Sequence, residues 1–125
     1  MDFETLFQNY KTNSLSGRYI TLDNIEPILQ QLNTNNQLEV VGQSVLNRPI
    51  YAYTIGQGAT KILMWSQMHG NESTTTKALF DFLFFLNGNS ETAKQWLAHF
   101  TFQCLPMLNP DGAKVYTREN ANGID

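Results

Sequence analysis

The sequence predicts an α/β protein in which a mixed sheet is flanked by helices. Some segments carry apolar residues at helical spacing. Others alternate between apolar and polar residues or are apolar throughout, as strands are. Their order along the chain is helices, hairpin, strand, long helix, short helix and strand, which is typical of an α/β domain. With 125 residues, 42% of them hydrophobic, the chain has the length and apolar content of one domain.

Apolar residues spaced three and four apart predict the helices. Two such stripes come first, over residues 3–12 and 22–33, and Asp23 is the expected N-cap of the second. A third stripe predicts a long helix over residues 72–86, which ends at an Asn-Gly-Asn sequence. Ser90 is then placed to cap a further short helix.

Four segments predict strands, at residues 38–46, 49–55, 62–65 and 100–108. The first two are expected to form a hairpin that turns at Asn47 and Arg48. The run from Ile62 to Trp65 is apolar throughout, which predicts a central strand covered on both faces. From Asn109 onward no periodicity is visible, and the sequence Asn-Pro-Asp-Gly predicts a turn.

Composition argues against several classes of protein. The net charge is -3 and there is no basic run, so nucleic-acid binding has no electrostatic support. The single cysteine, Cys104, excludes an internal disulfide framework. No signal peptide is visible and no apolar run approaches the ~20 residues of a membrane helix. We therefore expect a cytoplasmic protein without a membrane partner, although a processed, exported chain would look the same.

The stretch Met-Trp-Ser-Gln-Met-His-Gly-Asn-Glu-Ser places an imidazole and a carboxylate where the third expected strand gives way to the long helix. His69 and Glu72 are three positions apart, so in a first helical turn their side chains share one face. Both are good zinc ligands, and a catalytic zinc typically takes three protein ligands and a water. The spacing alone also fits an ordinary strand-to-helix turn, because the helix dipole favours an early Glu.

A second motif, Asn-Pro-Asp-Gly-Ala-Lys-Val-Tyr-Thr-Arg-Glu-Asn-Ala-Asn-Gly-Ile-Asp, occupies residues 109–125. Together with Met-His-Gly-Asn-Glu, it resembles the zinc metallocarboxypeptidases, the carboxypeptidase A-like family. The resemblance implies a zinc-exopeptidase-like fold, truncated in this chain, with His69 and Glu72 as two ligands of Zn²⁺. Arg118 stands where the family has the arginine that polarises the scissile carbonyl and stabilises the oxyanion. Residues 123–125 match the start of the family's Gly-[Ile/Val]-Asp segment, and the implied partner is a peptide with a free C-terminus.

These residue types suit the implied chemistry. Zinc polarises a peptide carbonyl and lowers the pKa of its bound water toward ~7. A guanidinium stays charged and presents a rigid set of donors to a developing oxyanion. Without the resemblance, the preferred interpretation of Arg118 is a solvated loop arginine paired with Glu119. Asp111 is expected to cap or close the Pro-Gly turn and to have no catalytic role.

The resemblance also implies residues that this sequence does not supply. The family has a further His ligand, a general-base Glu and an Asn-Arg pair for the substrate carboxylate, all C-terminal to the matched motifs. His99, the other histidine, is expected to be structural or surface-exposed, and Cys104 to lie in the core. We expect residues 1–125 to be the N-terminal part of a single metallocarboxypeptidase-like catalytic domain. Alone it should be inactive, bind zinc weakly or not at all, and self-associate through an uncovered sheet edge.

Two other functions stay open. One is a zinc amidohydrolase or deacylase of the succinylglutamate desuccinylase-aspartoacylase type. The His-Gly-Asn-Glu motif followed by an Arg also resembles the motifs of that group. The Asn-Pro-Asp-Gly spelling favours the carboxypeptidases, among which bacterial relatives that trim cell-wall peptides are included. The other is a non-catalytic binding fragment.

Overall fold

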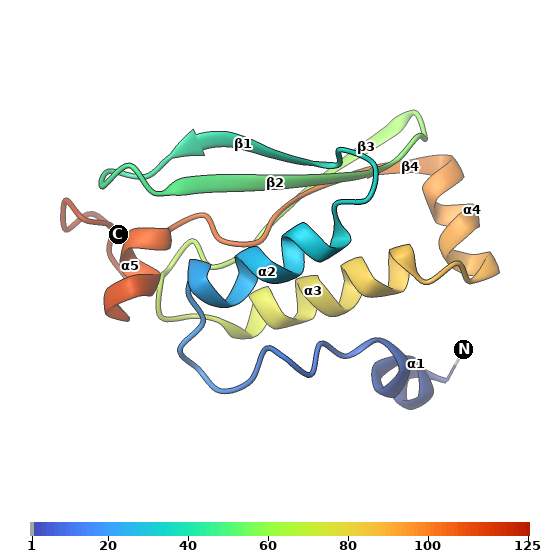
Figure 1. Cartoon of the computed structure of the whole chain (residues 1–125), viewed down its shortest axis with the longest axis horizontal. Coiled ribbons are helices and arrows are strands. Elements are labelled where there is room, and N and C mark those ends of the chain that lie inside the picture. Colours follow the sequence, from blue (N-terminus) through green and yellow to red (C-terminus); the bar gives the residue numbers. More distant parts are fainter. Residues whose placement is uncertain (1) are drawn as a thin grey trace.

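The computed structural model describes residues 2–125 (Figure 1). In chain order the elements are α1 (Phe3–Tyr10), α2 (Leu22–Leu32), β1 (Leu38–Gln43), β2 (Pro49–Gly56), β3 (Thr60–Trp65), α3 (Thr74–Asn87), α4 (Glu91–His99), β4 (Phe100–Leu105) and α5 (Pro110–Val115). The order from α1 to β4 is the one that the sequence predicts, with boundaries that differ by a few residues, whereas α5 lies where the sequence analysis expects only a turn.

The strands form one sheet in the order β1-β2-β4-β3. β1 and β2 are an antiparallel hairpin, and β2 is antiparallel to β4. β3 runs parallel to β4, and α3 and α4 form the crossover between these two strands. Helices α2 and α3 lie side by side beneath the sheet, with α1 beyond α3 (Figure 1). The predicted mixed sheet flanked by helices is confirmed.

The core lies between the sheet and helices α2 and α3. Tyr53 of β2 and Cys104 of β4 are fully buried there, as are Leu29 of α2 and Phe80 and Leu83 of α3. The Tyr53 hydroxyl is satisfied by donating to the carbonyl of Leu32, which the structure places 3.1 Å away. Burial raises the pKa of this phenol.

The start of α2 differs from the sequence prediction. Thr21, with extended backbone angles, is the N-cap, and its backbone N–H donates to Asn24 Oδ1 at 2.8 Å. Asp23 is therefore not the cap: it lies inside the first turn, where its charge suits the helix dipole, and it pairs with Lys114 at 2.9 Å. By contrast, Ser90 caps α4 as expected, since its Oγ accepts from the Ala93 N–H at 3.1 Å.

The expectation of a central, doubly covered strand at residues 62–65 is wrong for the part of the chain that the structure describes. β4 returns between β2 and β3, which leaves β3 at the sheet edge. Leu63 and Trp65 point away from the helices and are 57% and 53% exposed. An apolar run signals burial on both faces, but it does not reveal which chain segment provides the cover.

Among residues 2–125, none of the helices has both the length and the apolar character needed to cross a membrane.

Candidate metal and catalytic site

The loop between β3 and α3 carries His69 and Glu72, and buried polar side chains hold it in place. Ser66 Oγ donates to the carbonyl of Pro106 at 2.6 Å. Gln67 adopts a left-handed backbone, with φ of 46°, and its Nε2 donates to the carbonyls of Ile20 and Gly70, both at 2.8 Å. The helix begins at Thr74 rather than at residue 72, so Glu72 belongs to this loop.

Gly70 brings this loop into contact with α5. A Cβ atom at Gly70 would lie 2.0 Å from the carbonyl carbon of Gly112, a distance that no side chain tolerates. Glycine is thus needed at position 70, where the backbones of the two motifs meet, whereas a Cβ at Gly112 would instead clash with Asn109 and with the carbonyl of Glu119.

The Asn-Pro-Asp-Gly sequence forms the start of α5 rather than an isolated turn. Asn109 is the N-cap: its Oδ1 accepts from the Gly112 N–H at 2.9 Å, and Pro110 follows in the first turn. The Nδ2 of Asn109 donates to the carbonyls of Arg118 and Glu119, at 3.3 and 3.1 Å. Asn109 therefore fixes the segment that follows α5.

Asp111 is not the cap that the sequence suggests. It is 4% exposed and accepts hydrogen bonds from Ser44 Oγ at 2.9 Å and from the Leu46 N–H at 3.0 Å. Arg48 Nε lies 3.1 Å from the same carboxylate, without hydrogen-bond alignment. These contacts hold the β1–β2 loop against α5, which only the folded chain brings within reach.

The structure brings the predicted residues His69, Glu72 and Arg118 together, and adds Asp125. His69 Nδ1 lies 3.0 Å from Glu72 Oε2, and His69 Nε2 lies 3.1 Å from Asp125 Oδ1. Arg118 Nη1 donates to Glu72 Oε1 at 3.2 Å, and its Nε donates to Asp125 Oδ2 at 2.6 Å. These four side chains form a closed ring of contacts, which we call the His69 cluster.

Arg118 and Asp125 of the His69 cluster carry opposite charges, and each stabilises the ionised form of the other. The hydrogen bond from Arg118 and its positive charge hold the pKa of Asp125 below its usual value, with a smaller effect from His69. The same hydrogen bond raises the pKa of Arg118. The alternative pairing of Arg118 with Glu119 is wrong, because its carboxylate partners are Glu72 and Asp125.

Asp125 is the member of the cluster to which sequence reasoning gave no role. Its only sequence signal was the match of residues 123–125 to a family segment. In metal centres, a carboxylate on the second ring nitrogen of a histidine fixes the tautomer and the orientation of the imidazole. Asp125 occupies that position relative to His69 Nδ1.

The donor atoms of His69 and Glu72 fit a shared zinc ion. Two ligands about 2.1 Å from a tetrahedral zinc lie roughly 3.4 Å apart, close to the observed 3.0 Å between Nδ1 and Oε2. Asp125 faces the opposite ring nitrogen, so it does not add a third donor to the same ion. Within residues 2–125, no group of three or more His, Cys, Asp or Glu side chains is arranged to hold a metal.

Two other residues weighed from the sequence lie elsewhere in the fold. His99 is the last residue of α4, and its Nδ1 lies 2.7 Å from the carbonyl oxygen of Gln95. Cys104 is buried in β4, and burial raises the pKa of its thiol to about 12. The prediction that Cys104 is a core residue is confirmed.

A hollow of about 370 Å³ opens beside the cluster. The β1–β2 loop forms one wall with Val45, and Ile124 belongs to the opposite, C-terminal segment. His69, Arg118 and Met68 also line it, so the hollow exposes both candidate catalytic groups and apolar surface. The hollow therefore gives a ligand access to His69 and Arg118.

Comparison with solved structures shows the fold. The chain is similar to a metallo-carboxypeptidase from Burkholderia cenocepacia, with a TM-score of 0.73 and 22% identity, over 81% of this chain and 30% of that chain. It is also similar to thrombin activatable fibrinolysis inhibitor (TAFI), with a TM-score of 0.66 and 18% identity, over 94% of this chain and 36% of that one. At these identities the similarity speaks for the fold alone.

Two curated proteins are similar in sequence. Gamma-D-glutamyl-L-diamino acid endopeptidase 1 of Lysinibacillus sphaericus is 29% identical in an alignment of 116 positions, gaps included, that covers 86% of this chain and 28% of that protein. Cytosolic carboxypeptidase 3 of Bos taurus is 25% identical in an alignment of 109 positions, gaps included, that covers 76% of this chain and 11% of that protein. The chain thus spans less than a third of each of these relatives.

The family profile described as zinc carboxypeptidase (Peptidase M14) matches residues 25–125. The match takes in both motifs and every member of the His69 cluster. It also agrees with the fold similarity and with the resemblance that the motifs imply. The chain therefore belongs to the zinc carboxypeptidase family.

Proposed function

We propose that residues 2–125 form part of the catalytic centre of a zinc-dependent metallocarboxypeptidase, which hydrolyses the C-terminal peptide bond of its substrate. The observation that supports this is the His69 cluster. In a zinc carboxypeptidase chain, His69 and Glu72 present donor atoms 3.0 Å apart, with Arg118 and Asp125 in contact with them.

Each member of the cluster has a distinct task in this proposal. His69 and Glu72 hold the zinc ion, and Asp125 holds the imidazole through Nε2. Zinc, when bound, supplies carbonyl polarisation and an activated water. Arg118 engages the two carboxylates through Nε and Nη1, which leaves other guanidinium N–H groups to face the oxygen that becomes negative.

The hollow beside the cluster is the proposed place for the C-terminal part of the peptide. His69 and Arg118 line this hollow. Apolar side chains line it as well, from Val45, Met68 and Ile124. A peptide residue resting there would place its carbonyl near the guanidinium.

We further propose that the 125-residue chain is inactive by itself. His69 and Glu72 supply two ligands, whereas a catalytic zinc typically takes three from the protein. The other histidine, His99, contacts the backbone of its own helix. Isothermal titration calorimetry with zinc should therefore show weak binding, lost in His69→Ala and Glu72→Gln but kept in His99→Ala.

A second substrate class is supported by one observation, the 29% identity to gamma-D-glutamyl-L-diamino acid endopeptidase 1 over 86% of this chain. In that case the scissile amide joins a γ-glutamyl carbonyl to a diamino acid. The same cluster would serve, because zinc and a guanidinium act on the amide carbonyl and not on the side chains around it.

The test begins with the coding region beyond codon 125. If it continues with Leu-Asn-Arg and later supplies a His and a Glu, the whole protein should be expressed and assayed. Peptides with a free C-terminus, the same peptides with a C-terminal amide, and γ-D-glutamyl-diamino acid peptides separate the two substrate classes. An amidohydrolase would instead prefer small N-acyl amino acids, and a binding fragment would cleave none of these substrates.

Three variants make the assay specific. His69→Ala and Glu72→Ala should abolish hydrolysis, and Arg118→Gln should lower kcat by about 10²–10³-fold, as loss of an oxyanion donor does. His99→Ala is the matched control and should keep full activity. Hydrolysis that persists in His69→Ala would contradict the proposal.

A further inference from the structure

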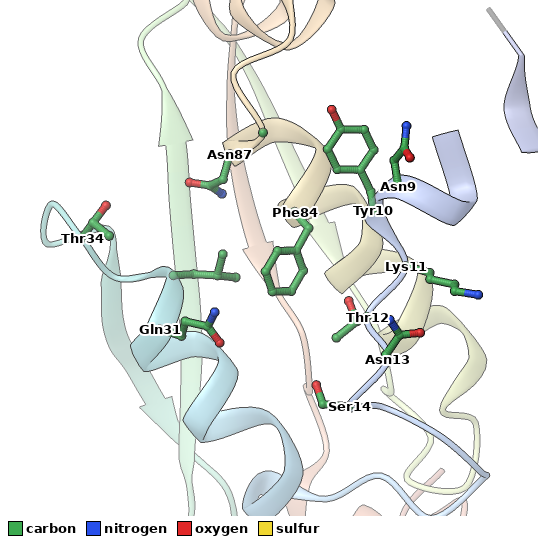
Figure 2. A pocket seen from close by; sticks show the side chains of 12 residues that line it. Asn9, Tyr10, Lys11, Thr12, Asn13, Ser14, Gln31, Thr34, Phe84 and Asn87 are labelled. Carbon is green, nitrogen blue, oxygen red and sulfur yellow. The ribbon is translucent and has the colours of Figure 1, made fainter. Parts of the chain in front are cut away.

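A second cleft lies at the other end of α3 from the His69 cluster, and we call it the α3 C-terminal cleft. Its walls are the segment 9–14 and the C-terminal ends of α2 and α3, and its volume is about 640 Å³ (Figure 2). Helix α3 has 14 residues, so it separates the cleft from Glu72 by roughly 20 Å. The volume is that of a site for a small molecule, and the distance places it outside the proposed catalytic centre.

The cleft is electrically neutral. Lys11 is the one charged residue in its lining within residues 2–125. The Lys11 ammonium donates to Gln8 Oε1 at 2.7 Å and lies 5.6 Å from the centre of the Phe7 ring. Figure 2 shows this side chain pointing out of the cleft, away from Phe84. An ionic ligand would therefore find no counter-charge there, and its desolvation would oppose binding.

Neutral hydrogen-bonding groups surround the cleft. Asn13 and Ser14 on one wall and Gln31 on the other are exposed, and they present amides and a hydroxyl to whatever enters. Thr12 Oγ1 is buried in the same lining and has no hydrogen-bond partner among residues 2–125. This oxygen is closed to solvent, so an entering ligand meets the exposed amides and hydroxyl of the walls and not the Thr12 hydroxyl.

Asn87 is the exception, because its side chain is already engaged. Its Nδ2 donates to the carbonyl of Leu83 at 2.8 Å, and its Oδ1 lies 3.2 Å from the Tyr53 hydroxyl, which it shares as a donor with the Leu32 carbonyl. These bonds fix the end of α3 at the edge of the cleft and so pre-organise that wall.

The aromatic ring of Phe84 provides a flat apolar surface between these polar groups. The half-buried ring of Phe84 projects from α3 into the space between α2 and the segment 9–14 (Figure 2). An aromatic ring bordered by amides and hydroxyls matches the two-sided chemistry of a sugar, whose C–H face stacks while its hydroxyls exchange hydrogen bonds. A peptide is less suited, because the walls are helix ends and a connecting segment and offer no strand edge.

We propose that the α3 C-terminal cleft binds a neutral carbohydrate, with Phe84 as the stacking surface and the exposed side chains of Gln31 and Asn13 as hydrogen-bonding groups. The proposal does not depend on zinc or on the peptidase reaction. It gives the chain a second, non-catalytic binding site, at the end of α3 that lies away from the proposed substrate hollow.

The test is an NMR titration of the ¹⁵N-labelled chain with trisaccharides of glucose and of N-acetylglucosamine. Glucose 6-phosphate tests for an anion site, and a blocked neutral tripeptide tests for peptide binding. We expect saturable shifts for at least one trisaccharide, at the Gln31 side-chain amide and at backbone amides of residues 9–14 and 84–88. The amides around His69 should not move.

Variants decide whether the contact is the proposed one. Phe84→Leu keeps apolar volume but removes the flat ring, and should weaken binding by roughly tenfold. Gln31→Ala should weaken it by a few-fold, whereas Gln30→Ala, one position along the same helix, should bind as the unmodified chain does. Each variant is first checked for an unchanged melting temperature.

Each outcome of the titration either supports or overturns the carbohydrate proposal. Cleft shifts with a trisaccharide that weaken in Phe84→Leu and Gln31→Ala support the proposal. Binding of the tripeptide or of the phosphate in preference to the sugars overturns it, as does a titration without cleft shifts. Sugar binding that neither variant changes also overturns it.

Discussion

Asn109 donates a hydrogen bond from its side-chain amide to the backbone carbonyl of Arg118, at 3.3 Å. The backbone N–H of Asn109 donates in turn to the carbonyl of Gln67, at 3.1 Å. Because Gln67 lies just before His69, one asparagine connects the loop of the proposed metal ligands to the segment of the proposed oxyanion donor. The relative position of His69 and Arg118 therefore depends on a residue that touches neither side chain.

Replacing Asn109 by Asp tests this connection. The substitution keeps the oxygen that caps the Gly112 N–H, but it turns the donor toward Arg118 and Glu119 into an acceptor facing two carbonyls. We expect a loss of about 1–3 kcal/mol in the free energy of unfolding and faster hydrogen exchange of the Thr117 and Gly123 amides. Amide exchange followed by NMR measures the local effect.

Ser90→Ala is the matched control for Asn109→Asp. It removes another N-cap, the one that accepts from the Ala93 N–H, and should cost about 1 kcal/mol. Exchange at Thr117 and Gly123 should stay as it was. Equal exchange rates in Asn109→Asp and in the unmodified chain would contradict the proposal that Asn109 fixes the segment after α5.

Gly70→Ala should be among the most destabilising small substitutions in the chain. Its Cβ would lie 2.0 Å from the Gly112 carbonyl carbon, and both contacting groups are backbone. We expect a loss of at least about 3 kcal/mol or failure to fold, measured by urea denaturation. Gly42→Ala, where a Cβ meets nothing within 4 Å, should change stability by less than about 1 kcal/mol. Similar urea midpoints for the two variants would contradict the close approach.

The pKa of Asp125 should depend on Arg118. The hydrogen bond and charge of Arg118 lower this pKa in the folded chain, so the linked stabilisation is present in full above about pH 3.9. It is lost as the pH falls through the lower, folded-state pKa. In Arg118→Gln the pKa of Asp125 should rise, as followed by carboxyl ¹³C shifts.

Asp23 provides the internal control for that titration. Its pKa is lowered by the hydrogen bond from Lys114, so Arg118→Gln should leave it unchanged and Lys114→Gln should raise it. An Asp125 titration that is the same with and without Arg118 would show that the two side chains do not pair in solution.

The exposed edge at β3 should make the isolated chain self-associate. Leu63 and Trp65 expose more than half of their surface beside an unpaired strand edge. Sedimentation velocity should show concentration-dependent dimers or larger species, which the double substitution Leu63→Lys and Trp65→Lys disperses. Val115→Lys is the control, because Val115 is 73% exposed but lies on α5. A monomer at all concentrations would rule this out.

Local patterns account for what the sequence predicts correctly. Apolar spacing identifies α2 and α3, and alternation identifies the β1–β2 hairpin, because these periods depend on neighbours a few residues apart. Ser90 is recognisable as a cap for the same reason. The His69–Glu72 pair is likewise a local signal, although a turn before α3, and not the first turn of the helix, brings the two donors together.

Partners from distant segments account for the errors. Asp111 looks like a turn residue, yet its hydrogen bonds go to Ser44 and Leu46, 67 and 65 positions away. Asp23 looks like a cap, but Thr21 has the extended backbone that a cap requires, and Lys114 provides the partner of Asp23. No window of neighbouring residues contains these contacts.

The sequence by itself therefore determined the order of the elements, the two motifs and the candidates His69, Glu72 and Arg118. Only the tertiary structure decided that β3 lies at an edge, that Asp125 contacts His69 Nε2, and that Arg118 reaches Glu72 across 46 positions. The physical reason is that periodicity and capping follow from the geometry of one turn or one strand. Strand order and ion pairing follow instead from how separate segments pack, and packing brings together residues that no local pattern links.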